Sequence, residues 1–162
     1  MIQDLTPELC DRYGDALSVL EPGLKSFGGQ SSFLGQAVTI KAFEDNSLVR
    51  EFVSQPGQGR VLVVDGGASM RRAMLGDMLA EKALNNGWQA ILIHGCIRDC
   101  EAISQMPIAV FALGTHPMKT EKLGAGQSQV PVTVQGCLIK PDDWVAGDPN
   151  GVVTSASSLV IE

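Results

Sequence analysis

Three observations predict an α/β fold with mixed sheets and flanking helices. The chain has 162 residues, a length that fits one domain spanning residues 1–162. In its first part, apolar runs of strand length alternate with amphipathic segments. Its last part consists of short apolar runs separated by Gly and Pro turns, a pattern typical of β structure. We therefore expect mixed α/β structure early in the chain and mostly strands late.

The first expected elements are a helix and a strand. Thr6 can serve as an N-cap and Pro7 suits the first helical position, so a helix is expected to begin here. Alternation over residues 36–43 predicts a strand that carries Val38 and Ile40 on one face. These two predictions begin the alternation of helix and strand.

Apolar runs and turn residues predict the elements that follow. The expected helices are a short one through Val53 with Asp45 or Asn46 as its cap, a longer one between Ser69 and Asn86 that restarts near Gly76, and a short one after Asp99. The expected strands lie over residues 60–65, 90–93, 108–113, 130–134, 137–139, 144–146 and 151–154. In the longer helix, Ala80, Ala83 and Leu84 form the inward face, and residues 85–87 supply the C-cap.

Charge and hydropathy restrict the kinds of partner. The net charge is −6 and the isoelectric point is about 4.8, whereas direct nucleic-acid binding requires a basic surface. An acidic surface can still dock onto a basic protein. The sequence contains no run of the ~20 apolar residues that a membrane helix needs. Residues 1–5 lack the basic-then-apolar pattern of a secretory signal, so a cytoplasmic location is expected.

The four cysteines are expected to be free thiols. Three residues lie between Cys96 and Cys100, and His94 is close in sequence, but the Cys-x2-Cys spacing typical of structural zinc is missing. Disulfides are rare in a reducing compartment. Buried thiols are therefore favoured for Cys10 and Cys137 as well, with zinc as the alternative.

The strongest chemical signal lies at Asp77 and at the pair Arg98-Asp99. Twenty residues separate Asp77 from the pair, and the expected order is helix, strand, then an exposed Arg-Asp. This order can bring two carboxylates and a guanidinium to one edge of a sheet. Carboxylates bind hard divalent cations, and arginine binds a carboxylate through paired hydrogen bonds. The combination favours metal-assisted chemistry on a small keto acid.

Structural roles are the alternatives for these residues and their neighbours. Asp99 can be a helix N-cap, and Asp77 can be a first-turn acid favoured by the helix dipole. Residues 65–67 follow a strand as a ligand loop does, but they lack the spacing of a phosphate or dinucleotide site, and a turn explains them better. No Gly-rich loop suits S-adenosylmethionine, so methyl transfer has no support. His94 is better explained as a strand-end histidine than as a catalytic base.

A set of short segments extends in order along nearly the whole chain. The segments are Cys10, Phe27-Gly28-Gly29, Lys41-Ala42-Phe43-Glu44-Asp45-Asn46, Arg60-Val61-Leu62-Val63-Val64-Asp65-Gly66-Gly67, Arg71-Arg72-Ala73 and Gly151-Val152-Val153. Together they resemble the RraA-like family, named for regulator of ribonuclease E activity A. The family also contains class II pyruvate aldolases that act on 4-hydroxy-4-methyl-2-oxoglutarate. The resemblance implies a single-domain β/β/α swivelling-domain fold and a ring-shaped homotrimer with sites between subunits.

Two functions occur in this family. One is non-catalytic inhibition of the endoribonuclease RNase E by protein binding. The other is a metal-dependent lyase activity, whose signature of Asp, twenty residues and Arg-Asp is intact here as Asp77 and Arg98-Asp99. The resemblance therefore implies a lyase that cleaves 4-hydroxy-4-methyl-2-oxoglutarate to two pyruvates. Decarboxylation of oxaloacetate passes through the same pyruvate enolate and is expected as a secondary activity, while inhibition of RNase E is the alternative function.

The lyase interpretation gives each motif residue a role. Asp99 is expected to bind Mg²⁺ or Mn²⁺ directly, because Mg²⁺ tolerates one protein carboxylate together with several waters. Asp77 would orient a metal-bound water as a catalytic residue. Arg98, also catalytic, would clamp the carboxylate of the 2-keto acid. The bound metal would stabilise negative charge on the enolate oxygen.

Neighbouring residues complete the expected site. The first-turn N–H groups of Met78 and Leu79 can donate to an anion. Gly76 has no Cβ and would let the substrate approach the turn. The expected substrate-binding residues are Gly76, Asp77, Met78, Leu79 and Arg98.

Three further residues have open roles. Lys119 and Lys122 lie where related aldolases carry a substrate-facing lysine, although the alignment is loose there. Asp148 could act as an acidic helper at a neighbouring subunit's site, and its alternative role is that of a turn residue before Pro149.

Overall fold

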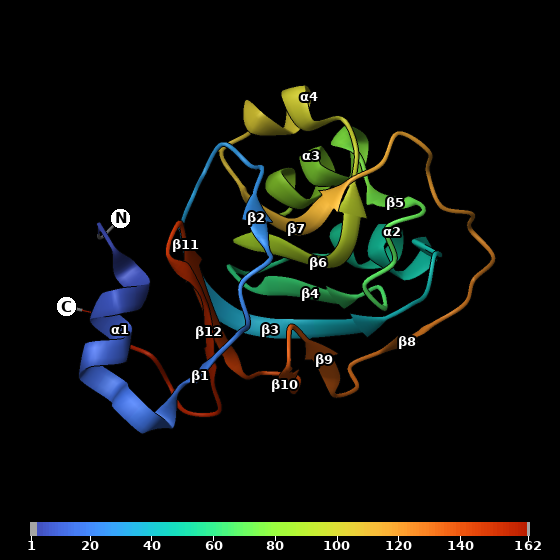
Figure 1. The fold of residues 1–162 in the computed structure, drawn as a ribbon. Coiled ribbons are helices and arrows are strands. Elements are labelled where there is room, and N and C mark those ends of the chain that lie inside the picture. Colours follow the sequence, from blue (N-terminus) through green and yellow to red (C-terminus); the bar gives the residue numbers. More distant parts are fainter. Residues whose placement is uncertain (1–2, 162) are drawn as a thin grey trace.

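A mixed β-sheet forms the centre of the molecule (Figure 1). The computed structural model describes residues 3–161, so Met1 and Ile2 of the N-terminal segment lie outside the described residues. Within them, ten strands form one sheet in the order β1-β12-β11-β3-β4-β6-β7-β2, with β5 beside β6 and β8 beside β3, and β9 pairs with β10 separately. The elements are α1 Leu5–Tyr13, η1 Gly14–Ala16, β1 Ser18–Val19, β2 Lys25–Ser26, β3 Phe33–Lys41, α2 Ser47–Val53, β4 Val61–Asp65, β5 Ala73–Leu75, α3 Asp77–Asn85, β6 Ala90–Ile97, α4 Cys100–Ser104, β7 Ala109–Thr115, β8 Gln127–Ser128, β9 Val132–Val134, β10 Cys137–Ile139, β11 Trp144–Asp148 and β12 Gly151–Ser155.

Strand β3 joins the two halves of the sheet. Its first residues pair antiparallel with β11, and its later residues, from Ala37 to Lys41, pair parallel with β4. The parallel strands β3, β4, β6 and β7 are connected through α2, α3 and α4, as the early alternation of helix and strand predicts. The late strands β11 and β12 form an antiparallel hairpin, which confirms the β-rich end of the chain.

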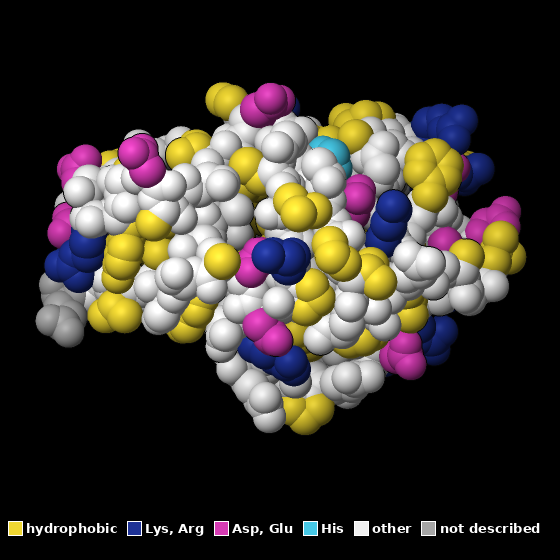
Figure 2. All heavy atoms as spheres, turned by 90° about the horizontal axis from the view of Figure 1, so that it is seen from below, with side chains coloured by type: hydrophobic (Ala, Val, Ile, Leu, Met, Phe, Trp, Pro, Cys, Tyr) yellow, Lys and Arg dark blue, Asp and Glu magenta, His cyan; other side chains and the backbone are white. Residues whose placement is uncertain are grey.

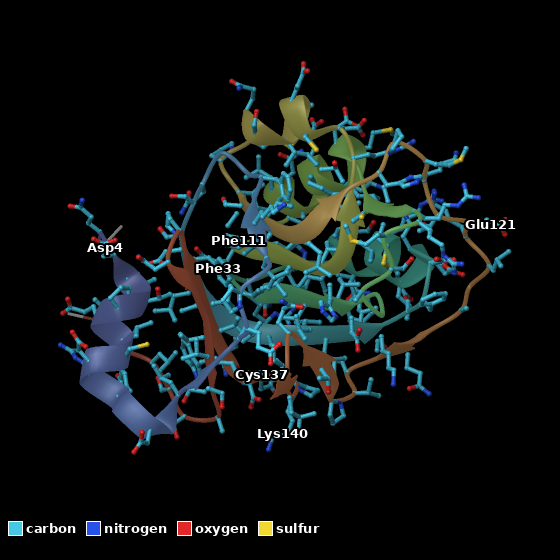
Figure 3. All side chains as sticks on the ribbon, in the orientation of Figure 1. Asp4, Phe33, Phe111, Glu121, Cys137 and Lys140 are labelled. Atoms are coloured by element: carbon cyan, nitrogen blue, oxygen red, sulfur yellow. The ribbon has the colours of Figure 1, made fainter. Side chains whose placement is uncertain are left out.

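Two apolar layers cover the two faces of the parallel strands. In β4, Leu62 and Val64 pack in the layer under α2, α3 and α4, whereas Val61 and Val63 belong to the opposite layer with β9 and β10. Side chains alternate between faces along a strand, so a strand buried on both faces is apolar throughout. In the second layer, the rings of Phe33 and Phe111 meet edge to face with centroids 5.3 Å apart (Figure 3).

Helix α1 packs against the outer hairpin. Leu5 and Leu9 are buried against residues of β11 and β12. The helix is confirmed, but the prediction that Thr6 is its N-cap is wrong, because the helix begins at Leu5. The backbone N–H and the hydroxyl of Thr6 instead donate to the carboxylate of Asp148, at 2.8 Å and 2.6 Å. Asp148 is 142 positions away in the sequence, so no local pattern predicts that it is the partner of Thr6.

The segment before α3 differs from the expected helix. Residues 73–75 form the short strand β5, and α3 begins only at Asp77. The N–H of Arg98 donates to the carbonyl of Leu75 at 2.9 Å, and Ala73 pairs with Cys96, so the edge of β6 provides the hydrogen bonds that a helix would have made internally. From Asp77 onward the prediction is confirmed: α3 buries Ala80 and Ala83 and ends at residues 85–87.

The other predicted elements are present, with shifted ends. Helix α2 is confirmed, and the side chain of Asp45 accepts hydrogen bonds from the N–H and hydroxyl of Ser47 at its start. Strand β6 continues four residues beyond the predicted end, through an irregularity after Ile93. The two-residue strands β1, β2 and β8 escaped prediction because they are too short to show alternation.

The surface carries charged side chains of both signs (Figure 2). Figure 2 shows one face of the molecule, where basic side chains are interspersed with acidic and hydrophobic ones. Within residues 3–161, no helix has both the length and the apolar character needed to cross a membrane. The four cysteines are unpaired in this part of the chain.

Candidate active site

The short strand β5 brings the two halves of the sequence motif together. Leu75 pairs with Ile97 at the end of β6, so the residues that follow each strand leave the sheet side by side. Those residues are Gly76-Asp77 on one segment and Arg98-Asp99 on the other. The carboxyl ends of parallel strands are the usual location of ligand sites in such sheets. The motif therefore meets where a site is expected.

The side chain of Asp99 connects the two segments. Its Oδ2 accepts a hydrogen bond from the backbone N–H of Asp77 at 3.0 Å and lies 3.9 Å from Nε of Arg98. Asp99 occupies the N-cap position of α4, but its side chain makes no capping hydrogen bond to that helix. Asp99 thus has the N-cap position that its structural alternative predicts, but it does not satisfy the amides of α4, since its carboxylate faces α3 instead. Its backbone is left-handed, with φ 59°, a conformation that Asp tolerates better than most residues.

Gly76 provides the space for this arrangement. A Cβ placed on Gly76 would lie 2.7 Å from Oδ2 of Asp99 and 3.5 Å from Nε of Arg98. The φ of Gly76 is −125°, so its backbone would suit any residue and only the close approach requires glycine. Gly76 therefore permits the close approach of neighbouring site residues, and the approach of a substrate to this turn stays a prediction.

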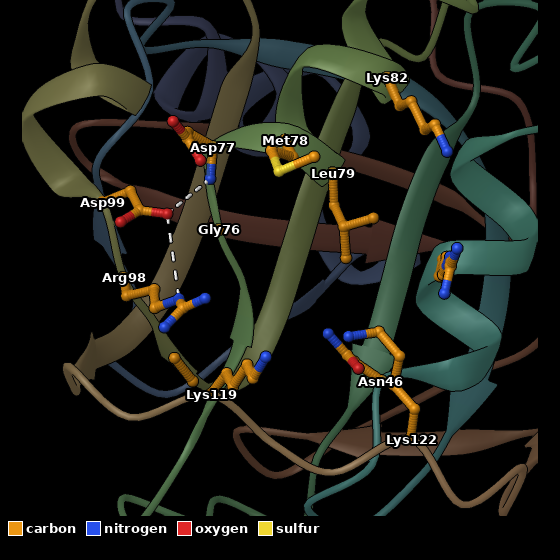
Figure 4. A pocket seen from close by; sticks show the side chains of 12 residues that line it. Asn46, Gly76, Asp77, Met78, Leu79, Lys82, Arg98, Asp99, Lys119 and Lys122 are labelled. Carbon is orange, nitrogen blue, oxygen red and sulfur yellow. Dashed lines mark hydrogen bonds and ion pairs between the residues drawn. The ribbon is translucent and has the colours of Figure 1, made fainter.

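A cavity of about 360 Å³ opens beside these residues (Figure 4). Asp77, Asp99 and Arg98 lie on one side of it, and Asn46, Lys82 and Lys122 lie on the other. Its lining residues are Asn46, Arg50, Ala73, Gly76, Asp77, Met78, Leu79, Lys82, Arg98, Asp99, Lys119 and Lys122. All six residues expected in the site are therefore brought together around one cavity.

The two lysines with open roles also line the cavity. The segment carrying Lys119 pairs with the free edge of β5, because Ala73 donates to the carbonyl of Met118 at 2.7 Å and accepts from the N–H of Thr120 at 3.0 Å. This pairing places Lys119 beside Arg98, whose Nη1 lies 3.4 Å from the carbonyl of Pro117.

Asp45 holds the next part of that loop. Its Oδ2 accepts hydrogen bonds from the N–H of Leu123 at 2.8 Å and of Ala125 at 3.2 Å, while its Oδ1 holds Ser47 at the start of α2. Burial opposes ionisation of Asp45, but these hydrogen bonds prevail and lower its pKa. A charged, buried carboxylate thus ties the loop of Lys122 to α2.

Three polar lining residues, besides Ala73, were not identified as site residues from the sequence. Asn46 and Arg50 are four residues apart and so lie on one face at the start of α2, and Lys82 comes from α3, which packs against α2. The amide of Asn46 donates to the carbonyl of Met74 at 3.2 Å, and its Oδ1 has no hydrogen-bond partner among the described residues. The four-residue spacing of Asn46 and Arg50 indicates that the two share one helix face. Only the packing of α2 on α3 shows that this face lines the cavity.

The cavity has the opposite charge from the chain. Five of its lining side chains are cationic and two are carboxylates, whereas the chain as a whole carries a net charge of −6. A cationic cavity in an acidic protein favours binding of small anions, because the local charges attract them despite the overall repulsion. The arrangement thus suits an anionic substrate.

The donor set fits a hard divalent cation that keeps most of its water. Residues 3–161 contain no group of three His, Cys, Asp or Glu side chains that could enclose a metal. The Asp99 carboxylate is 38% exposed at the cavity, and one of its oxygens, Oδ1, is not occupied by the Asp77 N–H bond. Mg²⁺ and Mn²⁺ accept such oxygen ligands, and Mg²⁺ releases water reluctantly. Asp99 is therefore the residue that could hold the ion.

Several other candidates lie elsewhere. Asp148 is 2% exposed, and its Oδ1 accepts hydrogen bonds from the hydroxyl of Thr6 and from the N–H of Asn150, which supports the structural role as a turn residue, while a role at a neighbouring subunit's site stays a prediction. His94 is a strand residue whose Nδ1 lies 3.6 Å from Asp65, and the Asp65 carboxylate raises its pKa. Asp65 also accepts from the N–H of Gly67, which confirms a turn there.

The cysteines do not contribute metal ligands or nucleophiles to the cavity. Burial raises the pKa of Cys96 and of Cys137, and burial together with the charge of Asp99 raises that of Cys100. A thiol with a raised pKa is protonated at neutral pH, and the protonated form is a poor ligand and nucleophile. The expectation of buried thiols is right for Cys96, whereas Cys10, Cys100 and Cys137 are partly exposed.

Sequence comparisons match nearly the whole chain. A model of the RraA-like family, described as Aldolase/RraA, matches residues 6–154. A protein of Pseudomonas fluorescens Pf-5, provisionally named 4-hydroxy-4-methyl-2-oxoglutarate aldolase, is 57% identical over 155 residues, which cover 96% of this chain and 95% of that protein. A protein of Azotobacter vinelandii with the same provisional name is 52% identical over 158 residues, covering 98% of each chain.

Two solved structures share the fold. One from Geobacillus kaustophilus, described as an S-adenosylmethionine:2-dimethylmenaquinone methyltransferase, is 44% identical with a TM-score of 0.92 and covers 94% of this chain and 95% of its own. The other, described as the RNA-processing inhibitor RraA from Thermus thermophilis, is 37% identical with a TM-score of 0.93 and covers 98% and 96%. These matches confirm the RraA-like α/β fold that the sequence resemblance implies.

Proposed function

Because the chain belongs to the RraA-like family, described as Aldolase/RraA, we propose that it is a divalent-metal-dependent lyase that cleaves 4-hydroxy-4-methyl-2-oxoglutarate to two pyruvates. Relatives that are 52–57% identical carry this enzyme's name provisionally. The observation that carries the proposal is the convergence of Asp77, Arg98 and Asp99 on one cavity. A carboxylate for the ion and a guanidinium for the keto acid are the groups that this reaction requires.

Arg98 is proposed to bind the carboxylate next to the keto group. Its Nε is 3.9 Å from Oδ2 of Asp99, and its Nη1 donates a hydrogen bond of 3.4 Å to the carbonyl of Pro117, so its remaining donors are available to a ligand. The N–H groups of Met78 and Leu79 lie in the first turn of α3, where no preceding helical carbonyl is available to them. They are proposed to donate to the same carboxylate or to the keto oxygen, aided by the helix dipole.

Cleavage breaks the bond between C3 and C4 of the substrate. The proton leaves the C4 hydroxyl, the C4–O bond becomes a carbonyl, and the electrons of the broken bond form the enolate of pyruvate, which then takes a proton at C3. Mg²⁺ or Mn²⁺ bound at Asp99 would supply a Lewis acid that stabilises the negative charge of the enolate. Asp77, on the same side of the cavity, is proposed to orient the water molecule that takes the hydroxyl proton.

Decarboxylation of oxaloacetate is proposed as a secondary activity. When the C3–C4 bond of oxaloacetate breaks, C4 leaves as CO₂ and the bond electrons form the same enolate, so the groups that bind the keto acid end serve both reactions. No additional side chain is required for this step.

A metal-dependent pyruvate-release assay tests the proposal. Wild-type protein with Mg²⁺ or Mn²⁺ is expected to release pyruvate from both substrates, and excess EDTA is expected to abolish the release. Arg98→Ala and Asp99→Ala should each lose most of the activity, whereas Lys140→Gln, an exposed residue outside the cavity, should keep it. Wild-type rates in both cavity variants would overturn the assignment.

The assembly and location follow from the same family membership. We propose that residues 1–162 form one RraA-like domain, that the protein is a cytoplasmic homotrimer, and that each cavity lies near a subunit boundary. The family match over residues 6–154 supports a single domain. Light scattering of the purified protein tests the trimer.

Binding to RNase E is a second candidate function. Its support is the match to the Thermus RraA structure, which is described as an RNA-processing inhibitor. An acidic surface would carry this interaction, so a complex should weaken with salt and should survive Arg98→Ala and Asp99→Ala. Lack of any complex at low ionic strength would remove this candidate.

A further inference from the structure

The guanidinium of Arg98 has a neighbour on each of two sides. Its Nε lies 3.9 Å from Oδ2 of Asp99, and its Nη1 donates to the carbonyl of Pro117 at 3.4 Å. Figure 4 shows Arg98 between Asp99 and Lys119. The first neighbour belongs to the sequence motif, whereas the second belongs to the segment that follows β7. The orientation of the guanidinium therefore depends on where the carbonyl of Pro117 lies.

The residue after β7 lies beside the residue after β6. Ile97 pairs with Thr115 at the ends of these parallel strands. Arg98 and His116 are the next residues, so they leave the sheet side by side. The N–H of His116 donates to the carbonyl of Ile97 at 3.0 Å, which fixes the start of the segment that carries Pro117.

Backbone hydrogen bonds do not close the turn at Pro117. Among the described residues, the carbonyl of Pro117 and the N–H of Met118 make no backbone–backbone hydrogen bond, and proline has no N–H. The carbonyl of Met118 accepts from the N–H of Ala73 at 2.7 Å, which fixes the far end of the segment. A side chain is therefore needed to define the turn between the two fixed ends.

The imidazole of His116 provides that contact. Its Nδ1 accepts a hydrogen bond from the N–H of Met118 at 3.0 Å. Asp and Asn side chains close turns in the same way, by accepting from the backbone N–H two positions later. Within residues 3–161 the ring makes no other hydrogen bond and no ion pair, and His116 does not line the cavity. Closing this turn is thus the hydrogen-bonding role of the side chain.

We propose that His116 is a positioning residue for Arg98, because its Nδ1 closes the turn that holds the carbonyl of Pro117 against the guanidinium. The inference rests on the proposed function in one respect, namely that Arg98 binds the carboxylate of the keto acid. A guanidinium that is fixed at one nitrogen presents its remaining N–H groups in one orientation. This preorganisation reduces the entropy that is lost when the carboxylate binds.

Three variants of His116 separate the acceptor from the bulk of the ring. His116→Ala removes both, and His116→Leu keeps an apolar side chain but has no acceptor. His116→Asn places an acceptor oxygen two bonds from Cβ, as Nδ1 is in histidine, and can therefore close the same turn. Thermal unfolding verifies that each variant is folded. The positioning role predicts that the asparagine variant behaves as the wild type does and that the other two do not.

Calorimetry with pyruvate in the presence of Mn²⁺ measures the effect without catalysis. His116→Ala and His116→Leu should each weaken pyruvate binding by about tenfold, whereas His116→Asn should change it less than about twofold. Binding of Mn²⁺ alone should be the same in all variants, because the turn contacts Arg98 and not Asp99. Wild-type affinity in the alanine variant, an equal loss in the asparagine variant, or no pyruvate binding by the wild type would each overturn the inference.

A double-mutant cycle tests whether His116 acts through Arg98. In an Arg98→Ala background, His116→Ala should weaken pyruvate binding no further, and titration to high millimolar pyruvate keeps the weak binding measurable. In a Lys119→Gln background it should still cost about tenfold. Lys119 is the matched comparison, because it enters the cavity from the same segment. A loss in the Arg98→Ala background as large as in the wild type would contradict the positioning role.

Steady-state kinetics separates this inference from the proposed function. In metal-dependent pyruvate release, His116→Ala should raise KM by about tenfold and change kcat less, and His116→Asn should restore KM. If the wild type releases pyruvate and His116→Ala has the same KM, the inference fails and the lyase stands. If the wild type binds pyruvate through Arg98 and His116 but releases none from its substrates, the lyase proposal fails while the positioning role stands.

Discussion

The carboxylate of Asp99 accepts a hydrogen bond from the backbone N–H of Asp77 at 3.0 Å, across 22 positions of sequence. This bond joins the end of β6 to the first residue of α3. It orients one oxygen of Asp99 toward the helix and leaves the other for a ligand in the cavity. The positive end of α3 also interacts favourably with the negative charge of Asp99.

The charge of Asp99 is the first feature to test. Asp99→Asn keeps the shape and tolerates the left-handed backbone of this position, but it removes the negative charge. We expect a loss of about 100-fold or more in metal-dependent pyruvate release, with thermal stability near that of the wild type. Titration with Mn²⁺ should show weaker metal binding in the variant. An active Asp99→Asn protein would show that the ion is held elsewhere.

The planar fork of Arg98 is the second feature. Arg98→Lys keeps the positive charge but cannot bind a carboxylate through two parallel hydrogen bonds. The KM for the keto acid should rise by roughly 10- to 100-fold, and kcat should change less. Steady-state kinetics at saturating Mg²⁺ measures both constants. Unchanged KM would mean that Arg98 acts only as a charge.

The missing Cβ of Gly76 is the third feature. Gly76→Ala would place a carbon 2.7 Å from Oδ2 of Asp99, so the carboxylate must move. A displacement of this kind is expected to reduce activity by up to about 100-fold. Gly95→Ala is the matched control, because its new Cβ would meet no atom closer than 3.4 Å. Equal activity in the two variants would show that the position of Asp99 is not critical.

Asp148 provides a test of stability and its pH dependence. Burial opposes its ionisation, but hydrogen bonds from Thr6 and Asn150 prevail and lower its pKa below the ordinary value of 3.8. The carboxylate therefore stabilises the fold fully above pH 3.8, and this contribution is lost as the pH falls through the lowered pKa. Asp148→Asn should cost roughly 2 kcal/mol at pH 7 in urea unfolding.

The cost of Asp148→Asn should shrink when unfolding is measured at pH 3, because the wild-type carboxylate then loses its advantage. The variant should cleave substrate at the wild-type rate under conditions where it is folded, since Asp148 lies outside the cavity. A cost that is the same at pH 3 and pH 7 would contradict the assigned hydrogen bonds.

Asp45 tests the support of the lysine-bearing loop. Asp45→Ala removes the acceptor of the Leu123 and Ala125 N–H groups, so the loop should become mobile. Limited proteolysis within residues 121–126 should be faster, and the KM should rise through Lys122 while metal binding stays unchanged. Glu51→Ala, an exposed change on α2, serves as the control. Protease resistance equal to that of the control would contradict the role of Asp45.

The sequence alone determined the parts that depend on local patterns. Alternation identified β3, and apolar runs identified β4, β6 and β7, because strands buried on both faces are apolar throughout. Turn and capping residues identified α2 and the end of α3. The fixed spacing of Asp77 and the Arg98-Asp99 pair indicated a site, since residues after parallel strands share one edge of a sheet.

Only the tertiary structure decided the parts that depend on distant partners. Residues 73–75 were expected to be helical, and they form a strand because β6 offers them hydrogen bonds at the place where they pass it. That strand is what brings Asp77 to Asp99. Arg50 and Lys82 line the same cavity because α2 packs on α3. Local propensity contains no information on such contacts, because the interactions that stabilise them join segments far apart in the chain.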